Sequence, residues 1–289
     1  MLTTMSMLLE DAEKKSHAVG AFNVPTLEAV RAVIAAAEEC NQPVIIQHAE
    51  VHEKYMPLSI IGPIMLDFAA RASVPVAVHL DHGESFDICI QAMRMGFTSV
   101  MYDASSKPFE TNVMETAEIV KIARALGVAV EAEIGCVLAS AVGGGEGRST
   151  GNMDDPEDCY TNPDDADLFV KETGVDALAI SFGTVHGVYL AEPVLNMELV
   201  KKIKRRVKIP LVMHGGSGIS HDDYEEAIRS GITKINYYTY MSMAGGMAVA
   251  DYIEERKDGR TVFFHDISQI AAQAMKKNVE ETIRVFSMK

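Results

Sequence analysis

Eight short apolar runs alternate with longer amphipathic segments along most of this 289-residue chain. The runs are Ala18–Val24, Pro43–Gln47, Val74–His79, Ser99–Tyr102, Val128–Ile134, Ala177–Ser181, Pro210–His214 and Thr233–Asn236. They are nearly continuous in apolar residues, as expected for strands of a parallel sheet that helices cover on both faces. The segments between them, such as Met114–Gly127, carry apolar residues at helical spacing.

Eight strands that are each followed by a helix predict an α/β fold, a (β/α)8 TIM barrel. An open, doubly wound sheet is the alternative, but eight units within 289 residues favour a closed barrel. The segment Ile267–Phe286 predicts an extra C-terminal helix. Because no linker separates these parts, we expect residues 1–289 to form one barrel domain.

The composition limits which binding partners and which cellular compartment can be expected for this protein. A formal net charge of −15 argues against a nucleic acid or an anionic membrane as partner. No stretch approaches the roughly 18 apolar residues of a membrane-spanning helix, and no basic region precedes the first apolar run, so no signal peptide is expected. The scattered cysteines, Cys40, Cys89, Cys136 and Cys159, suggest reduced thiols. Together these features predict a cytoplasmic protein.

Three histidines follow apolar runs at equivalent places in their βα units: His82 in VPVAVHLDHG, His186 in DALAISFGTVHG and His214 in IPLVMHGGSG. A single histidine there is more often a packed or loop residue. Three together suit a catalytic zinc site, which takes three protein ligands and keeps one open position. Asp81, directly beside His82, places an acid/base next to that ion.

Two carboxylates end neighbouring strand runs on the same face. Asp103 and Glu133 either cap the helices that follow, provide a second or alternative metal position, or orient a histidine through a hydrogen bond. The segment Gly135–Pro163 then shows no strand or helix periodicity and is rich in glycine and acidic residues. A connection of this length is usually functional or mobile, and it lies on the face where barrels carry their active sites.

An anion site is predicted after the last two strands. Gly215, Gly216 and Ser217 follow the seventh strand, and Asn236 and Thr239 lie at the end of the eighth. Loops at these places commonly bind phosphate in barrels. A plain glycine turn explains the first group alone, but the two groups together favour phosphate.

The chain resembles the class II, metal-dependent fructose-bisphosphate and tagatose-bisphosphate aldolases. The resemblance runs from GAFNVPTLEAV through HLDHG, MYDAS, VEAEIG, YTNP, GTVHG and HGGSG to KINYYT. It implies that His82, His186 and His214 bind zinc, with Asp103 and Glu133 serving an alternative metal position. Asp81 would exchange a proton with the hydroxyl beyond the cleaved bond. Glu146 would match the family's mobile-loop glutamate, which handles the proton on the nucleophilic carbon.

The resemblance also implies how a phosphorylated sugar would be held. The residues that it assigns to the C1-phosphate end are Gly187, Gly215, Gly216, Ser217, Asn236 and Thr239, while Asn23 would reach the same substrate. A monovalent cation near the phosphate is a further expectation, as is a homodimer or homotetramer. No Schiff-base lysine is needed, and Lys234 is the only lysine within the strand ends.

The chain departs from the family pattern around the distal half of the substrate. The sequence Asn236–Tyr240 lacks the usual acidic residue, and Gln47 and His48, with His52 nearby, replace small residues. His265 stands where bisphosphate aldolases carry the arginine that contacts the distal phosphate. Arg260, or a residue of a partner subunit, is an alternative source of that charge.

These features predict zinc-dependent, reversible aldol cleavage of a ketose 1,6-bisphosphate, or of a related ketose 1-phosphate, to dihydroxyacetone phosphate and an aldehyde. A metal-dependent sugar-phosphate isomerase or epimerase on the same barrel is the alternative. A non-catalytic phosphosugar-binding protein is the third reading, although binding alone needs no proton-transfer group beside the histidines.

Overall fold

The protein is described from a computed structural model that covers residues 1–143 and 156–289. Eight parallel strands form its central sheet: β1 (Val19–Asn23), β2 (Val44–Ala49), β3 (Val76–Gly83), β4 (Ser99–Tyr102), β5 (Ala129–Ile134), β7 (Ala177–Ile180), β9 (Leu211–Met213) and β10 (Ile232–Tyr237). They pair in the closed order β1-β10-β9-β7-β5-β4-β3-β2. The predicted (β/α)8 barrel is therefore confirmed, and the open sheet is excluded.

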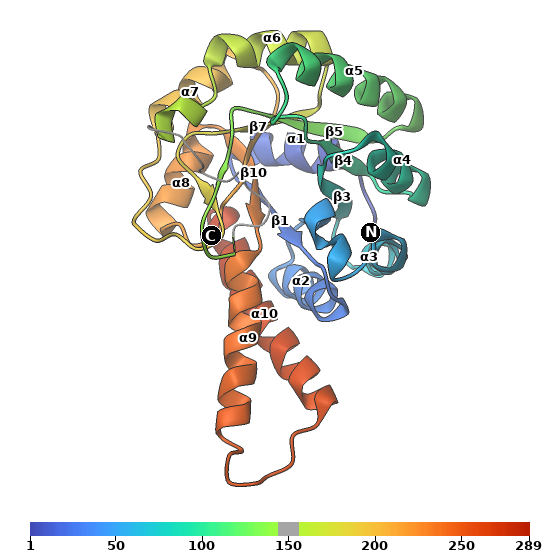
Figure 1. The fold of residues 1–289 in the computed structure, drawn as a ribbon, viewed down its shortest axis with the longest axis vertical. Helices are drawn as coiled ribbons and strands as arrows, with labels where there is room; N and C mark the ends of the chain where they lie inside the picture. Colours follow the sequence, from blue (N-terminus) through green and yellow to red (C-terminus); the bar gives the residue numbers. More distant parts are fainter. Residues whose placement is uncertain (144–155) are drawn as a thin grey trace.

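Helices surround this barrel (Figure 1). They are α2 (Leu27–Cys40), α3 (Leu58–Arg71), α4 (Phe86–Met95), α5 (Phe109–Leu126), α6 (Pro163–Thr173), α7 (Met197–Arg206) and α8 (His221–Ser230). Several start where a side chain accepts a first-turn N–H, as Thr26 does from Ala29 and Ser85 from Ile88. Helix α5 ends at Leu126, and Gly127 caps it with a φ of 71°.

Short elements complete the loops at one end of the barrel. They are the 3-10 helices η1 (Glu50–Lys54) and η2 (Pro156–Cys159) and the two-residue strands β6 (Leu138–Ala139) and β8 (Val185–His186). β6 and β8 pair with each other outside the barrel, and Ser140 donates its backbone N–H to the carbonyl of His186. The segments after β5 and β7 are thereby held together.

The third strand is longer than the predicted run Val74–His79. β3 pairs with β2 as far as Ala49 opposite Asp81, so Asp81 and His82 belong to the strand rather than to a loop. The pairing of β3 with β4 then shifts between Leu80 and Gly83, and His82 takes a positive φ of 43°. This irregularity is a bulge that re-aims the last side chains of the strand.

Helix α1 (Met5–Lys15) plugs the end of the barrel that holds the strand N-termini. Its Met5, Leu8, Leu9 and Ala12 are buried in one cluster with small residues that line the barrel, including Ala21 and Ala77. This plug keeps water from that end of the barrel.

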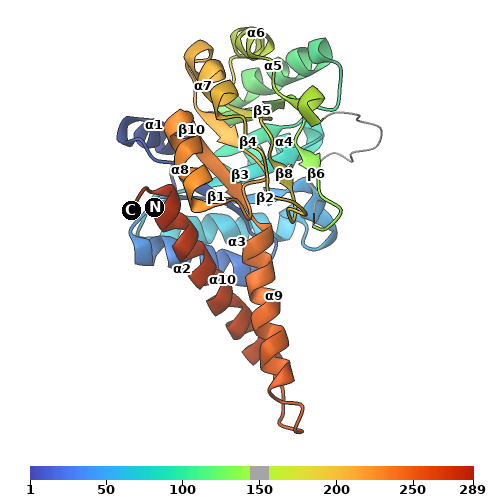
Figure 2. The ribbon, with the colours of Figure 1, turned by 90° about the vertical axis from the view of Figure 1, so that its left-hand side faces the viewer.

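The last two helices form an arm. α9 (Thr239–Glu254) leaves the barrel and α10 (Phe264–Phe286) returns to it, packing along α9 and α2 (Figure 2). The C-terminal helix was predicted, but the hairpin was not. Within the described residues, no helix combines the length and the apolar character needed to cross a membrane.

A disulfide corrects the prediction that all the cysteines are reduced. Cys136, just after β5, is bonded to Cys159 in η2, whereas Cys40 and Cys89 are free. The backbone N–H of Cys136 also donates to the carbonyl of Cys159. The bond closes the base of the long segment between β5 and α6. Since disulfides are rare in reducing compartments, the cysteines no longer support the expected cytoplasmic location.

We expect loss of this disulfide to destabilise the fold. It spans 23 positions, and opening a loop of that size lowers the free energy of unfolding by roughly 3 kcal/mol in the chain-entropy model. The double substitution Cys136→Ala with Cys159→Ala should therefore unfold at lower urea concentration, and so should the parent protein in reductant. The matched control is Cys40→Ala. Identical unfolding midpoints with and without reductant would contradict this expectation.

Candidate functional site

The three predicted histidines meet at the barrel mouth. His82 ends β3, His186 lies on β8 and His214 follows β9, and all three are buried. Their ring centroids lie 4.6 to 5.7 Å apart. His214 Nδ1 lies 2.9 Å from His82 Nε2, and each of the three offers a nitrogen within 4.8 Å of the others. The three nitrogens are therefore close enough to share one metal ion.

Carboxylates hold two of these rings from behind. Asp103 Oδ2 lies 2.8 Å from His82 Nδ1, and Glu131 Oε1 lies 2.9 Å from His214 Nε2. The other nitrogen of each ring therefore faces the centre of the triad. Neither nitrogen of His186 has a hydrogen-bond partner among the described residues, although both are buried. A metal ion at the triad would bind one of these two nitrogens, so the residues fit the zinc that the sequence predicts.

The protonation tendencies of the rings differ. Burial lowers the pKa of His186 well below its usual value and also lowers that of His214, which favours neutral ligands. Burial acts on His82 in the same direction, but the charges of Asp81 and Asp103 outweigh it and raise the pKa of His82.

Asp81 lies beside the triad and is fully buried. Its carboxylate accepts hydrogen bonds from three side-chain amides: Asn23 at 2.9 Å, Gln47 at 3.0 Å and Asn236 at 3.0 Å. Burial alone would raise the pKa of Asp81, but the nearby charges of His82 and Lys234 help to lower it below its ordinary value. The carboxylate is thus held ionised and in one orientation.

The residues expected to hold phosphate line one pocket next to the triad. Its described walls are Asn23, His186, Gly187, Gly215, Gly216, Ser217, Asn236, Tyr237, Tyr238 and Thr239. Gly215 has a φ of 63°, and a Cβ there would meet the Val185 carbonyl at 2.4 Å, so only glycine fits. Helix α9 begins at Thr239 without a side-chain cap, which leaves its N-terminus available to an anion.

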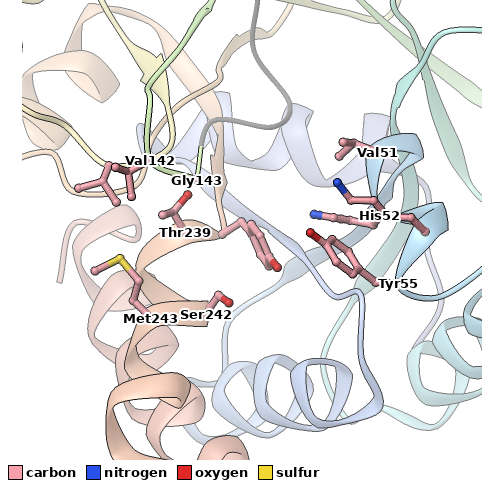
Figure 3. A pocket seen from close by; sticks show the side chains of 11 residues that line it. Val51, His52, Tyr55, Val142, Gly143, Thr239, Ser242 and Met243 are labelled. Atoms are coloured by element: carbon pink, nitrogen blue, oxygen red, sulfur yellow. The ribbon is translucent and has the colours of Figure 1, made fainter. Parts of the chain in front are cut away.

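A wider pocket of about 320 Å³, here called the outer pocket, adjoins the phosphate pocket and shares Tyr238 and Thr239 with it. Figure 3 shows His52 and Tyr55 on one side of it and the start of α9, with Ser242 and Met243, on the other. The ring of His52 lies 4.9 Å from that of Tyr238, tilted by 56°. Burial, followed by the nearby His48, lowers the pKa of His52 to about 4. The imidazole is therefore neutral at neutral pH.

Some of the other predicted site residues contact the triad or Asp81, and others do not. Gln47 contacts Asp81, whereas His48 turns to Glu53 at 3.1 Å. Glu133 lies near the triad, with Oε2 3.8 Å from His214 Nδ1, and could join His82 and Asp103 in an alternative metal group. Glu146 lies outside the described residues.

Arg260 and His265 are not near the triad of their own chain. Arg260 lies in the connection between α9 and α10, and His265 lies at the start of α10. Figure 1 shows this connection at the end of the arm that is far from the barrel. Helix α9 starts at the phosphate pocket and has 16 residues, a length of about 24 Å. The sequence did not reveal Tyr55 and Met243 in the outer pocket, nor the part that Glu131 and Lys234 play beneath the site. Two residues that it singled out, His52 and Thr239, do line the outer pocket.

Comparisons with known proteins identify the family of the chain. A family model described as fructose-bisphosphate aldolase class-II matches residues 3–289. The fructose-bisphosphate aldolase of Geobacillus stearothermophilus is 41% identical over 257 residues, which cover 87% of this chain and 86% of that protein. That of Staphylococcus aureus is 37% identical and covers 99% and 97%. The crystal structure of the YdjI aldolase from Escherichia coli K12 matches with a TM-score of 0.85 and 37% identity over 99% and 97% of the two chains.

We expect the protein to bind one zinc ion at the triad. His214→Ala should lose stoichiometric zinc, because two imidazoles leave the ion with too few protein ligands. Metal content of the purified protein, measured by mass spectrometry, checks this. The matched control is His221→Ala, an exposed histidine at the start of α8. Equal zinc content in the parent and in His214→Ala would place the metal elsewhere.

Proposed function

Because this chain belongs to the class II fructose-bisphosphate aldolases, which are carbon–carbon lyases, we propose that it is a zinc-dependent enzyme that reversibly cleaves a 1-phosphorylated ketose. The products are dihydroxyacetone phosphate and an aldehyde. One observation carries the proposal: the histidine triad, the clamped Asp81 carboxylate and the phosphate pocket converge at one barrel mouth.

In this proposal His82, His186 and His214 hold the ion. Bound zinc supplies Lewis-acid stabilisation of the negative charge that develops on the three-carbon half during cleavage. Asp103 fixes the ring of His82 by accepting from its Nδ1. With Glu133 it also forms the alternative metal group.

The phosphate pocket would hold the C1 end of the ketose. Ser217 and Thr239 bring hydroxyls, and the uncapped N-terminus of α9 brings backbone N–H groups and the positive end of the helix dipole. The Ser217 hydroxyl already accepts the N–H of Tyr238 at 3.0 Å, so it can donate its proton to an anion. This end of the substrate is thereby fixed relative to Asp81.

Asp81 would do the proton transfer. Its carboxylate takes the proton of the C4 hydroxyl, the C3–C4 bond breaks, and the bonding electron pair remains with C3. The aldehyde leaves, and C3 is then protonated to complete dihydroxyacetone phosphate. We assign this second proton to Glu146 by its resemblance to the mobile-loop glutamate of the family.

The outer pocket would hold the aldehyde half. Lys54 is the only charged side chain among the described residues that line it, and its ammonium lies 4.9 Å from the ring centre of Tyr55. His52 is neutral there. A second phosphate is better held by a bidentate, permanently charged arginine. The lining therefore favours an aldehyde without a phosphate.

We also propose that the protein works as a homodimer or homotetramer. The arm exposes Met247, Phe263 and Phe264, the last with 81% of its surface open to solvent. Apolar surface of this kind is usually covered by a partner.

We expect Asp81→Ala to keep zinc and phosphate binding but to lose cleavage. Removing a positioned acid/base typically lowers the rate by about 10²–10⁴-fold. The measurements are kcat from coupled detection of dihydroxyacetone phosphate, and zinc content of the same sample. Asp87→Ala, an exposed acidic residue in the first turn of α4, is the control. A near-normal kcat for Asp81→Ala would remove this residue from the mechanism.

The substrate proposal is tested by comparing fructose 1,6-bisphosphate, tagatose 1,6-bisphosphate and fructose 1-phosphate, together with a condensation screen of dihydroxyacetone phosphate against varied aldehydes. We expect weak cleavage of both bisphosphates and a higher kcat/KM on another 1-phosphorylated ketose. An efficient, strongly preferred reaction with either bisphosphate would refute this specificity. Turnover without release of dihydroxyacetone phosphate would instead support the isomerase or epimerase alternative.

A further inference from the structure

A buried ion pair crosses the barrel interior beneath the triad. Glu131 Oε2 on β5 lies 2.8 Å from Lys234 Nζ on β10, and both side chains are fully shielded from solvent. β9 and β7 separate the two strands in the sheet, so the pair spans the interior rather than a strand ladder. Burying two charges is costly and often brings no net stability. The pair therefore calls for an explanation other than holding the barrel together.

Glu131 determines which nitrogen of His214 faces the metal position. A carboxylate only accepts hydrogen bonds, so the contact of Oε1 with His214 Nε2 at 2.9 Å favours a proton on Nε2. The Asn236 amide nitrogen also lies near Nε2, but at the longer distance of 3.3 Å, and it donates to Asp81. The lone pair of a neutral His214 is then on Nδ1, the atom that lies 2.9 Å from His82 Nε2.

Lys234 determines the orientation of the Asn236 amide in the same way. An ammonium group only donates, so its contact with Asn236 at 2.8 Å fixes the amide oxygen on the side of Lys234. The amide NH2 then faces Asp81 and donates to Oδ1 at 3.0 Å. A flipped amide would place its oxygen against the Asp81 carboxylate.

We propose that Glu131 and Lys234 are a pair of positioning residues for the reaction. Glu131 orients the ring of the metal ligand His214, and Lys234 orients the Asn236 amide that binds the proton acceptor Asp81. One buried ion pair thus aligns both the metal site and the proton-transfer site. The inference rests on the proposed function, because it assigns His214 to zinc and Asp81 to proton transfer.

Two double substitutions separate positioning from support of the fold. Glu131→Leu with Lys234→Met removes both charges in favour of apolar groups of similar size, a change that folded proteins often tolerate. We expect an unfolding midpoint near that of the parent, zinc affinity lowered by about 10–100-fold in chelator competition, and a reduced kcat. Parent-like zinc affinity and kcat would overturn the proposal.

Glu131→Gln with Lys234→Met is the matched variant. Its amide oxygen can still accept from His214 Nε2, whereas Asn236 has lost its partner. We expect zinc affinity within a few-fold of the parent but a lowered kcat at little-changed KM. Parent-like kcat in this variant would overturn the Asn236 half of the proposal, and a 10–100-fold loss of zinc affinity would overturn the His214 half.

The zinc-loaded parent provides a readout that does not depend on any variant folding. Long-range 15N–1H spectra report which nitrogen of His214 carries the proton, and a proton on Nδ1 would overturn the assignment. Failure of the proposed function looks different, because the parent itself would then neither bind zinc at the triad nor release dihydroxyacetone phosphate.

Discussion

The parallel pairing of β1 with β10 closes the sheet, and the clamp on Asp81 depends on it. In that pairing Ala21 lies opposite Asn236, and the pairing of β1 with β2 places Asn23 opposite Gln47. The three amides that bind Asp81 thus come from β10, β1 and β2, three consecutive strands next to β3. If β1 and β10 separated, Asn236 would move away from the Asp81 carboxylate. The closure that defines the fold therefore also builds the proton-transfer site.

The side chains inside the barrel change from apolar at one end to polar and charged at the other. At the end closed by α1 the barrel is filled with small apolar side chains, and toward the mouth it carries His79, Asp81, Glu131 and Lys234, all fully buried. Buried charge is tolerated only where partners are at hand. Here Lys234 neutralises Glu131, amides surround Asp81, and His79 Nδ1 meets the Ser99 hydroxyl at 2.9 Å. The buried polar side chains near the mouth thus have partners within the barrel, and the apolar cluster next to α1 lies below them.

The sequence predicted the strands well because parallel strands covered on both faces read as apolar runs. It also identified residues of the mouth, since strand ends meet there in any such barrel. It could not reveal the Cys136–Cys159 bond, because the two cysteines are 23 positions apart with no diagnostic spacing. The pairing of Glu131 with Lys234 could not be predicted, since the sequence of a strand does not show whether a charged side chain faces the barrel interior or the solvent. The hairpin of α9 and α10 was missed because it depends on contacts of α10 with α9 and α2, and a sequence pattern does not show which helices pack together.

The adjacency of Asp81 and His82 at the end of β3 has a mechanical consequence. Asp81 and His82 are neighbours on one stretch of backbone, whereas His186, His214 and the phosphate pocket belong to other strands and loops. When thermal motion deforms the barrel, those parts shift relative to one another. The Asp81 carboxylate and the His82 ring move together, because their residues are adjacent in the chain. Thermal motion would thus vary the distance from the proton acceptor to the phosphate while barely changing its distance to this imidazole. An insertion between these two residues would remove that rigidity.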